Sequence, residues 1–226
     1  MGSLFDFPKQ IDLLKQLFNS SMVDLVTPKL ERLNEIFLVC EQAWKKNLRR
    51  LRKAEVKYIL FSEAPPWTKS GPVRHFYNTF DGDLGGKVWR AFFDHSKPED
   101  VEFGLQQLAD RGVLVIDSLP FAMKYNSTIR KNPLYGALIK ESSVFLVGKL
   151  NDGRIKWAKD VKAAFAFKLN GKRIMEAFPH GIRLATNRVL VFDNEGIAAD
   201  RSGYTNSEKI KKIFGIRGSY LRRRMF

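Results

Sequence analysis

Residues 56–66 read VKYILFSEAPP, an apolar run that ends abruptly in polar residues and prolines. The first six residues have the length and the β-branched and aromatic content of a buried strand. Proline has no backbone N–H to donate to a sheet, so Pro65 and Pro66 predict that the strand has ended before them. We therefore expect Glu63 at the carboxyl end of a buried strand.

Further apolar stretches follow the same pattern. Residues 112–116 (GVLVI) predict a second strand that ends at Asp117, residues 144–147 (VFLV) a third, and residues 173–178 a fourth that runs into His180. Helices are expected at 88–93, 98–111, 133–142, 155–168 and 207–214, with an edge strand at 189–192. Strands alternating with helices predict a short, mainly parallel sheet in a three-layer α/β/α fold. Ligands bind beyond the carboxyl ends of such strands, where Glu63, Asp117 and His180 should converge.

The residues before this unit are expected to be helical. Between residues 8 and 52, apolar side chains recur at helical spacing, with a break at Ser20–Ser21 and a second helix that starts near Pro28. The predicted organisation is an N-terminal helical segment (1–53) that packs on the core, an α/β domain (54–216) and a basic C-terminal tail (217–226).

The charge of the 226-residue chain is concentrated in two places. Lys and Arg number 39 against 24 Asp and Glu, a net charge of +15. Residues 44–53 hold six cations and no acid, and residues 201–226 hold eight cations and one acid, so these 36 residues carry 13 of the 15 charges. Such local concentrations favour a polyanion partner, and DNA or RNA rather than a membrane. The residues expected to contact phosphates are Lys45, Lys46, Arg49, Arg50, Arg52, Lys53, Arg222, Arg223 and Arg224.

Several classes of protein are excluded by what the sequence lacks. The single cysteine, Cys40, cannot build a disulfide framework, a cysteine-rich zinc site or a four-cysteine iron–sulfur cluster. Walker A, G-x-S-x-G and G-x-G-x-x-G motifs are missing. The chain has no secretory segment and no apolar run near 18 residues, so we expect a cytoplasmic protein. We also expect a monomer without a metal, a cofactor or an obligate protein partner.

In their order along the chain, the three polar strand ends resemble motifs of the uracil-DNA glycosylase superfamily. Residues 62–66 (SEAPP) are similar to its G-E-A-P-G or G-Q-D-P-Y motif, residues 112–117 (GVLVID) to its G-V-L-L-L-N strand, and residues 178–181 (FPHG) to its final histidine motif. The similarity spans about residues 54–185. It implies a monofunctional DNA glycosylase and, given the lone cysteine, a relative without the iron–sulfur cluster of the G-E-A-P-G branch.

The resemblance also implies roles for particular residues. Glu63 would position water and stabilise the oxocarbenium-like sugar, and His180 would donate to the departing base. Phe76 or Phe80 would stack on the flipped base. Arg183 or Leu184, in the loop after the histidine motif, would fill the gap that the base leaves.

Asp117 departs from the family pattern, and this departure bears on the substrate. Uracil-excising members have asparagine here, whose amide donates to uracil O4 and accepts from N3–H. A carboxylate only accepts, so Asp117 would repel O4 and suits the N4 amino group of cytosine, and a protonated Asp117 would also donate to cytosine N3. We therefore expect a modified cytosine, such as those of phage DNA, and a role in anti-phage defence. The alternatives are a nucleic-acid-binding α/β protein without catalysis and a metal-dependent nuclease or phosphoesterase that uses Asp81, Asp83 and Asp117.

Overall fold

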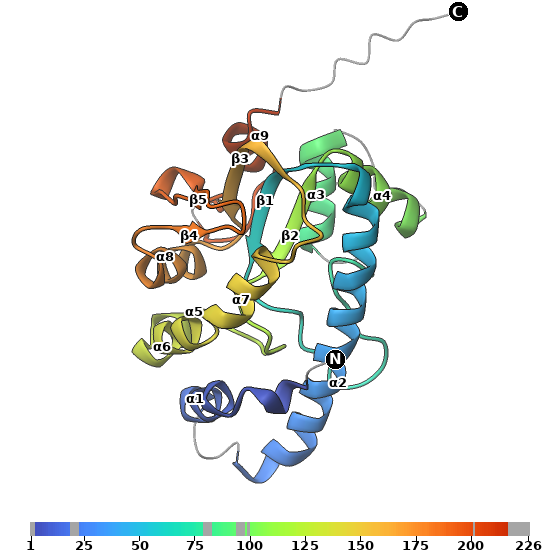
Figure 1. The fold of residues 1–226 in the computed structure, drawn as a ribbon. Coiled ribbons are helices and arrows are strands. Elements are labelled where there is room, and N and C mark those ends of the chain that lie inside the picture. Colours follow the sequence, from blue (N-terminus) through green and yellow to red (C-terminus); the bar gives the residue numbers. More distant parts are fainter. Residues whose placement is uncertain are drawn as a thin grey trace, which may run out of the picture.

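A parallel sheet lies at the centre of the computed structural model, which describes residues 3–18, 23–78, 83–93, 98, 100–200 and 202–216, without the side chains of 23–28 and 83 (Figure 1). Its strands are β1 (Val56–Ser62), β2 (Val113–Asp117) and β3 (Trp157–Phe165), in the order β2-β1-β3. β1 is the central strand, between its two neighbours, and its Ile59, Leu60 and Phe61 are almost fully buried.

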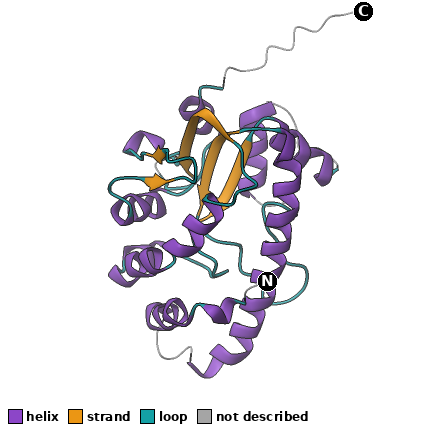
Figure 2. Cartoon of the chain, in the orientation of Figure 1, coloured by secondary structure: helices purple, strands orange, loops and turns teal. Residues whose placement is uncertain are grey.

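Helices flank the sheet and give the predicted three-layer α/β/α fold (Figure 2). In Figure 1, α2 (Val23–Arg50), α3 (Asp83–Phe93) and α4 (Val101–Asp110) lie to the right of the sheet. To its left lie α8 (Lys168–Ala177) and the antiparallel ribbon of β4 (Ile182–Arg183) and β5 (Val189–Leu190). The remaining helices are α1 (Pro8–Phe18), α5 (Ser127–Lys131), α6 (Pro133–Glu141), α7 (Ser143–Leu150) and α9 (Ser207–Phe214), with short 3-10 turns at Leu4–Asp6, Leu51–Lys53 and Asn194–Gly196.

The register of the sheet brings two predicted strand ends together. Ser62 at the end of β1 pairs with Asp117 at the end of β2, and Phe61 pairs with Phe165 at the end of β3. The three strands therefore finish along one edge of the sheet, which we call the carboxyl edge. β1 and β2 were predicted within one residue at each end, and both predictions are confirmed.

Local chemistry explains where some elements begin. The Asp100 side chain accepts hydrogen bonds from the backbone N–H groups of Glu102 and Phe103 and so caps α4. Gly112, just before β2, has φ +76°, and a Cβ there would lie 2.3 Å from the carbonyl oxygen of Glu55. Only glycine allows the chain to turn this close to β1.

A side chain holds β2, one of the two outer strands of the central sheet. The Tyr77 hydroxyl donates to the carbonyl oxygen of Val115 at 2.6 Å and accepts from its N–H at 2.8 Å. Tyr77 is itself buried, and its ring lies 6.3 Å from that of Trp44 on α2. The loop after β1 is thereby fastened to both β2 and α2.

The second half of the predicted strand pattern is wrong. Residues 144–147 lie in α7 and residues 173–178 lie in or just after α8, whereas the helix predicted at 155–168 is largely β3. The second long helix begins at Val23 rather than near Pro28, and the predicted break at Ser20–Ser21 lies outside the described residues. The helices predicted at 88–93, 98–111, 133–142 and 207–214 are confirmed, and β5 confirms part of the edge strand at 189–192.

Candidate functional site

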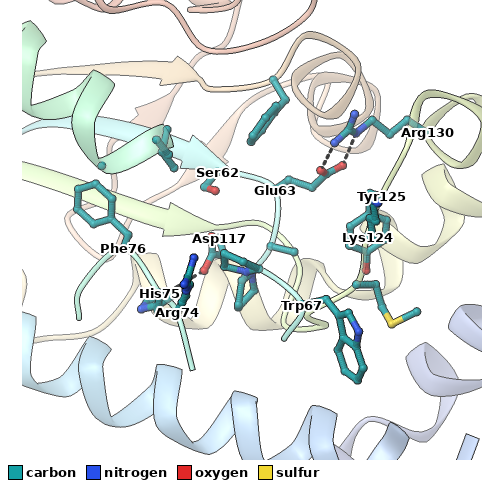
Figure 3. A pocket seen from close by; sticks show the side chains of 17 residues that line it. Ser62, Glu63, Trp67, Arg74, His75, Phe76, Asp117, Lys124, Tyr125 and Arg130 are labelled. Atoms are coloured by element: carbon teal, nitrogen blue, oxygen red, sulfur yellow. Dashed lines mark hydrogen bonds and ion pairs between the residues drawn. The ribbon is translucent and has the colours of Figure 1, made fainter. Parts of the chain in front are cut away.

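A pocket of about 500 Å³ opens at the carboxyl edge of the sheet. Figure 3 shows the arrows of two neighbouring strands, β1 and β2, ending beside each other at its wall. Residues from the ends of both strands line it, together with the loop after β1, the start of α3, the loop after β2 and Phe167 after β3. The location is where a parallel sheet is expected to bind its ligand.

Glu63 lines the pocket, but both of its carboxylate oxygens are occupied. Arg130 of α5 binds them in a bidentate pair, with Nε 2.8 Å from Oε1 and Nη2 2.6 Å from Oε2 (Figure 3). The Tyr135 hydroxyl donates to Oε1 at 2.6 Å and accepts from the amide of Asn170 at 2.9 Å. The Glu63 side chain is only 7% exposed, so this network compensates a nearly buried charge.

The same network affects the ionisation of its members. Burial and the negative charge of Glu63 raise the pKa of Tyr135 well above its ordinary value, and the same causes raise the pKa of Tyr125. The hydrogen bonds that Arg130 donates to Glu63 raise the pKa of the Arg130 guanidinium. Both tyrosines therefore remain protonated at neutral pH, and Tyr135 can act as a donor to the carboxylate.

Asp117 has a different environment. Its Oδ2 lies 3.0 Å from Nε2 of His75, and its Oδ1 forms no hydrogen bond with the described residues. We assign the proton of this hydrogen bond to Nε2 of His75, because a carboxylate can only accept. Nδ1 of His75 is buried and has no hydrogen-bond partner among the described residues. Asp117 thus keeps one carboxylate oxygen for a ligand.

Aromatic side chains and cations complete the pocket. The aromatic residues that line it are Trp67, Phe76, Tyr125 and Phe167, besides the imidazole of His75. Phe76 is half-buried, as expected for a residue that can stack on a ligand. Two exposed cations, Arg74 and Lys124, also line the pocket, and Arg130 lies over the Phe167 ring at 5.4 Å. The pocket thus combines apolar walls with a few charged groups.

His180 does not join this site. It lies in the exposed turn between α8 and β4, because the strand predicted before it is a helix. Phe167, which lines the pocket, precedes α8, and a ten-residue helix is about 15 Å long. The predicted convergence of three strand ends is therefore correct for Glu63 and Asp117 and wrong for His180. Arg183 is exposed and Leu184 is buried beyond the same turn.

The basic run on α2 lies at the other end of the sheet. It immediately precedes β1, so it lies beside the amino ends of the strands, while the pocket lies at their carboxyl ends. Arg50 is buried and pairs with Glu102 of α4, which also binds Lys46 at 2.6 Å. The other cations of the run, Lys45, Arg49, Arg52 and Lys53, are half-buried or exposed. None of the six lines the pocket, so their contacts with phosphates stay a prediction, and the structure places them away from the pocket.

Some predicted residues lie outside the described part of the chain. These are Phe80, Asp81, Arg222, Arg223 and Arg224, and the side chain of Asp83. Conversely, two residues of the site were missed. His75 is next to Phe76 in a loop that was itself predicted to be functional, and this position was the available signal. No local pattern marks Arg130, because its partner Glu63 is 67 residues away in the sequence.

Comparison with protein-family models, with curated proteins and with solved structures finds no match to this chain. The site is therefore interpreted from its own geometry. Within the described ranges, no helix is long and apolar enough to cross a membrane.

Proposed function

We propose that the chain is a DNA glycosylase, which hydrolyses the N-glycosidic bond of a base flipped into this pocket. The observation that carries the proposal is that two acids from neighbouring strand ends, Glu63 and Asp117, line one cavity with aromatic walls. An enzyme that acts on a base must extract it from the stack, and apolar and aromatic side chains hold the extracted base. A volume of about 500 Å³ lies within the range of small-ligand pockets.

In this proposal Phe76 stacks on the base and Asp117 reads its edge. Asp117 lines the pocket with an oxygen that no described residue occupies, while His75 holds the other oxygen at 3.0 Å. Such an acceptor suits an exocyclic amino group and opposes a carbonyl oxygen. The preferred base is therefore of the cytosine type, with a 5-substituent such as those of phage DNA, and this choice is compatible with anti-phage defence.

Cleavage leaves negative charge on the departing base, which needs a donor or a cation nearby. We assign this role to Arg130 in place of His180. Arg130 lines the pocket, and its Nη1 forms no hydrogen bond within the described residues. Glu63 then acts through Arg130 as a positioning residue, because both of its oxygens are already bound.

The test is release of bases from duplex oligonucleotides that contain uracil, cytosine, 5-hydroxymethylcytosine or its glucosylated form. Alkali converts each abasic site into a strand break, so excision is measured without knowing the product. We expect breaks only at the modified cytosines. Efficient release of uracil with none from the cytosine derivatives contradicts the substrate, and no release from any duplex favours the non-catalytic binding protein.

The matched variant is Asp117→Asn, which keeps the size of the side chain and adds a donor. We expect it to lower release of the modified cytosine by about 100-fold, since an unpaired polar group in a site costs about 1–3 kcal/mol. It should gain measurable release of uracil, because the amide can donate to O4 and accept from N3–H. If Asp117→Asn lowers the release of all bases equally, Asp117 does not recognise the edge of the base.

A further inference from the structure

The amino ends of the strands carry a cluster of cations that the pocket does not use. Six exposed residues form what we call the amino-end surface: Arg49, Arg52, Lys53, Lys57, Arg111 and Lys156. They come from the end of α2, the 3-10 turn after it, β1, the turn before β2 and the segment before β3. They are thus distant in sequence and gathered by the topology of the sheet.

Backbone hydrogen bonds place these segments side by side. Val56 donates to the carbonyl oxygen of Lys156 at 2.7 Å, and Lys57 donates to that of Gly112 at 2.9 Å. Gln106, in the middle of α4, donates to the carbonyl oxygen of Arg50 at 3.4 Å, which joins α4 to the end of α2. The six cations therefore share one end of the molecule.

The amino-end surface keeps most of its charge unpaired. None of its six cations forms an ion pair with the part of the chain that the structure describes, and Arg111 lies over the Phe93 ring at 5.4 Å. Two exposed acids, Glu55 and Asp110, lie in the same segments, and Asp110 accepts a hydrogen bond from Gln106. Six cations against two acids leave a surplus of four positive charges.

We propose that the amino-end surface is a second nucleic-acid-binding surface, which binds the phosphates of a duplex segment other than the one at the pocket. Unpaired, exposed cations release counterions when they meet phosphates. A lipid surface is disfavoured, because none of the exposed large hydrophobic residues of the described chain lies in these segments. Those residues are Phe5, Phe103, Val144, Val189, Val191 and Tyr204.

The amino-end surface and the pocket lie at opposite ends of the strands. The seven residues of β1 span about 20 Å between the amino-end surface and the pocket. Duplex DNA is stiff, and bending 20–30 base pairs by 40–90° costs about 1–6 kcal/mol. A straight duplex that lies across the mouth of the pocket, at the carboxyl ends of the strands, does not reach the cations at their amino ends without bending, so we assign the amino-end surface to a separate segment. Only this last step rests on the proposed function.

The test measures binding of an unmodified, fluorescent 20-base-pair duplex by anisotropy between 50 and 200 mM KCl. The test variant of the full chain carries Lys53→Gln, Lys57→Gln and Lys156→Gln. Its matched control carries Lys9→Gln, Lys140→Gln and Lys172→Gln, which are also exposed and remove the same charge. We expect the test variant to lower the slope of log K against log[salt] by about 2–3, since each phosphate contact contributes about 0.9.

Equal slopes for the two triple variants overturn the proposal. So does a result in which the test variant loses binding to anionic phospholipid vesicles but keeps binding to the duplex. Asp117→Asn should leave the slope unchanged, which separates this surface from the pocket whether or not any base is excised. The claim of a second segment is tested with two duplexes, one labelled with a fluorescent donor and the other with an acceptor. The unaltered chain should bring them together and give energy transfer, whereas the test variant should not. Energy transfer that persists with the test variant overturns the claim of a second segment.

Discussion

Glu63 and Asp117 stand at the ends of adjacent strands and line the same pocket, yet their surroundings differ. Glu63 has a bidentate arginine and a tyrosine hydroxyl on its two oxygens, whereas Asp117 has one histidine on one oxygen. A carboxylate whose lone pairs are filled by the protein stabilises the fold and positions its partners. A carboxylate with a free oxygen is available to a ligand, which is why we assign base recognition to Asp117.

The largest effect is expected from Glu63→Gln. Loss of the Glu63 carboxylate leaves the largely buried guanidinium of Arg130 without a counter-charge. This loss lowers the unfolding free energy by about 3–5 kcal/mol. Urea unfolding of Glu63→Gln, Arg130→Met and the double variant measures the coupling of the pair. We expect the double variant to be much more stable than the sum of the single losses suggests. Strictly additive losses contradict the view that the pair stabilises the fold as a unit.

Asp117→Asn should give the opposite profile. We expect it to change the unfolding free energy by less than about 1 kcal/mol, because the Asp117 side chain makes a single hydrogen bond with the described residues, the one that His75 donates. The same variant should lower release of a modified cytosine by about 100-fold, as calculated above. Urea unfolding and base release on one preparation check both halves. A stability loss equal to that of Glu63→Gln removes the distinction between the two acids.

His75 should matter for the pocket more than for the fold. His75→Ala removes the donor that holds Asp117, and we expect about a tenfold lower kcat/KM, which corresponds to about 1.4 kcal/mol for one lost hydrogen bond. His75→Gln offers an amide donor and should restore much of the activity. We therefore expect kcat/KM to be lower for His75→Ala than for His75→Gln. Equal activity of both variants means that the hydrogen bond to Asp117 does not position the acid.

The smallest effect concerns the alkaline limit of stability. Burial raises the pKa of Tyr135 in the folded state above the value of about 10 of an unfolded chain. Its contribution to stability is thus complete below about pH 10 and is lost as the pH rises further, because only the unfolded state ionises readily. Urea midpoints from pH 8 to 11 should fall less steeply for Tyr135→Phe. Tyr204→Phe, an exposed tyrosine, is the control and should follow the unaltered chain.

The first half of the sheet could be predicted from sequence because apolar residues dominate both of its strands. β1 and β2 are buried and end in residues that stop a strand, so Glu63 and Asp117 were placed correctly. β3 contains Lys159, Asp160 and Lys162 at its exposed centre, and it is a strand because it pairs with β1. Such pairing depends on the rest of the fold, so the sequence of β3 itself shows no periodic pattern of apolar residues that would predict a strand.

The errors about the site follow from the same cause. A four-residue apolar run such as residues 144–147 fits a strand and a helix equally well, and α7 is the outcome. Once that half of the pattern was misassigned, His180 appeared at a strand end that does not exist. His75 and Arg130 reach the pocket through the paths of two loops, which hydrophobic periodicity does not describe.

The attachment of Tyr77 to β2 has a consequence for the behaviour of the chain in a crowded solution. β2 is an outer strand, and an outer strand normally offers free N–H and C=O groups on which a strand from another molecule can add. The Tyr77 hydroxyl takes both groups of Val115, the middle residue of β2, and so occupies the position that a foreign strand would need. The loop that forms the pocket wall therefore also protects the sheet against edge-to-edge aggregation.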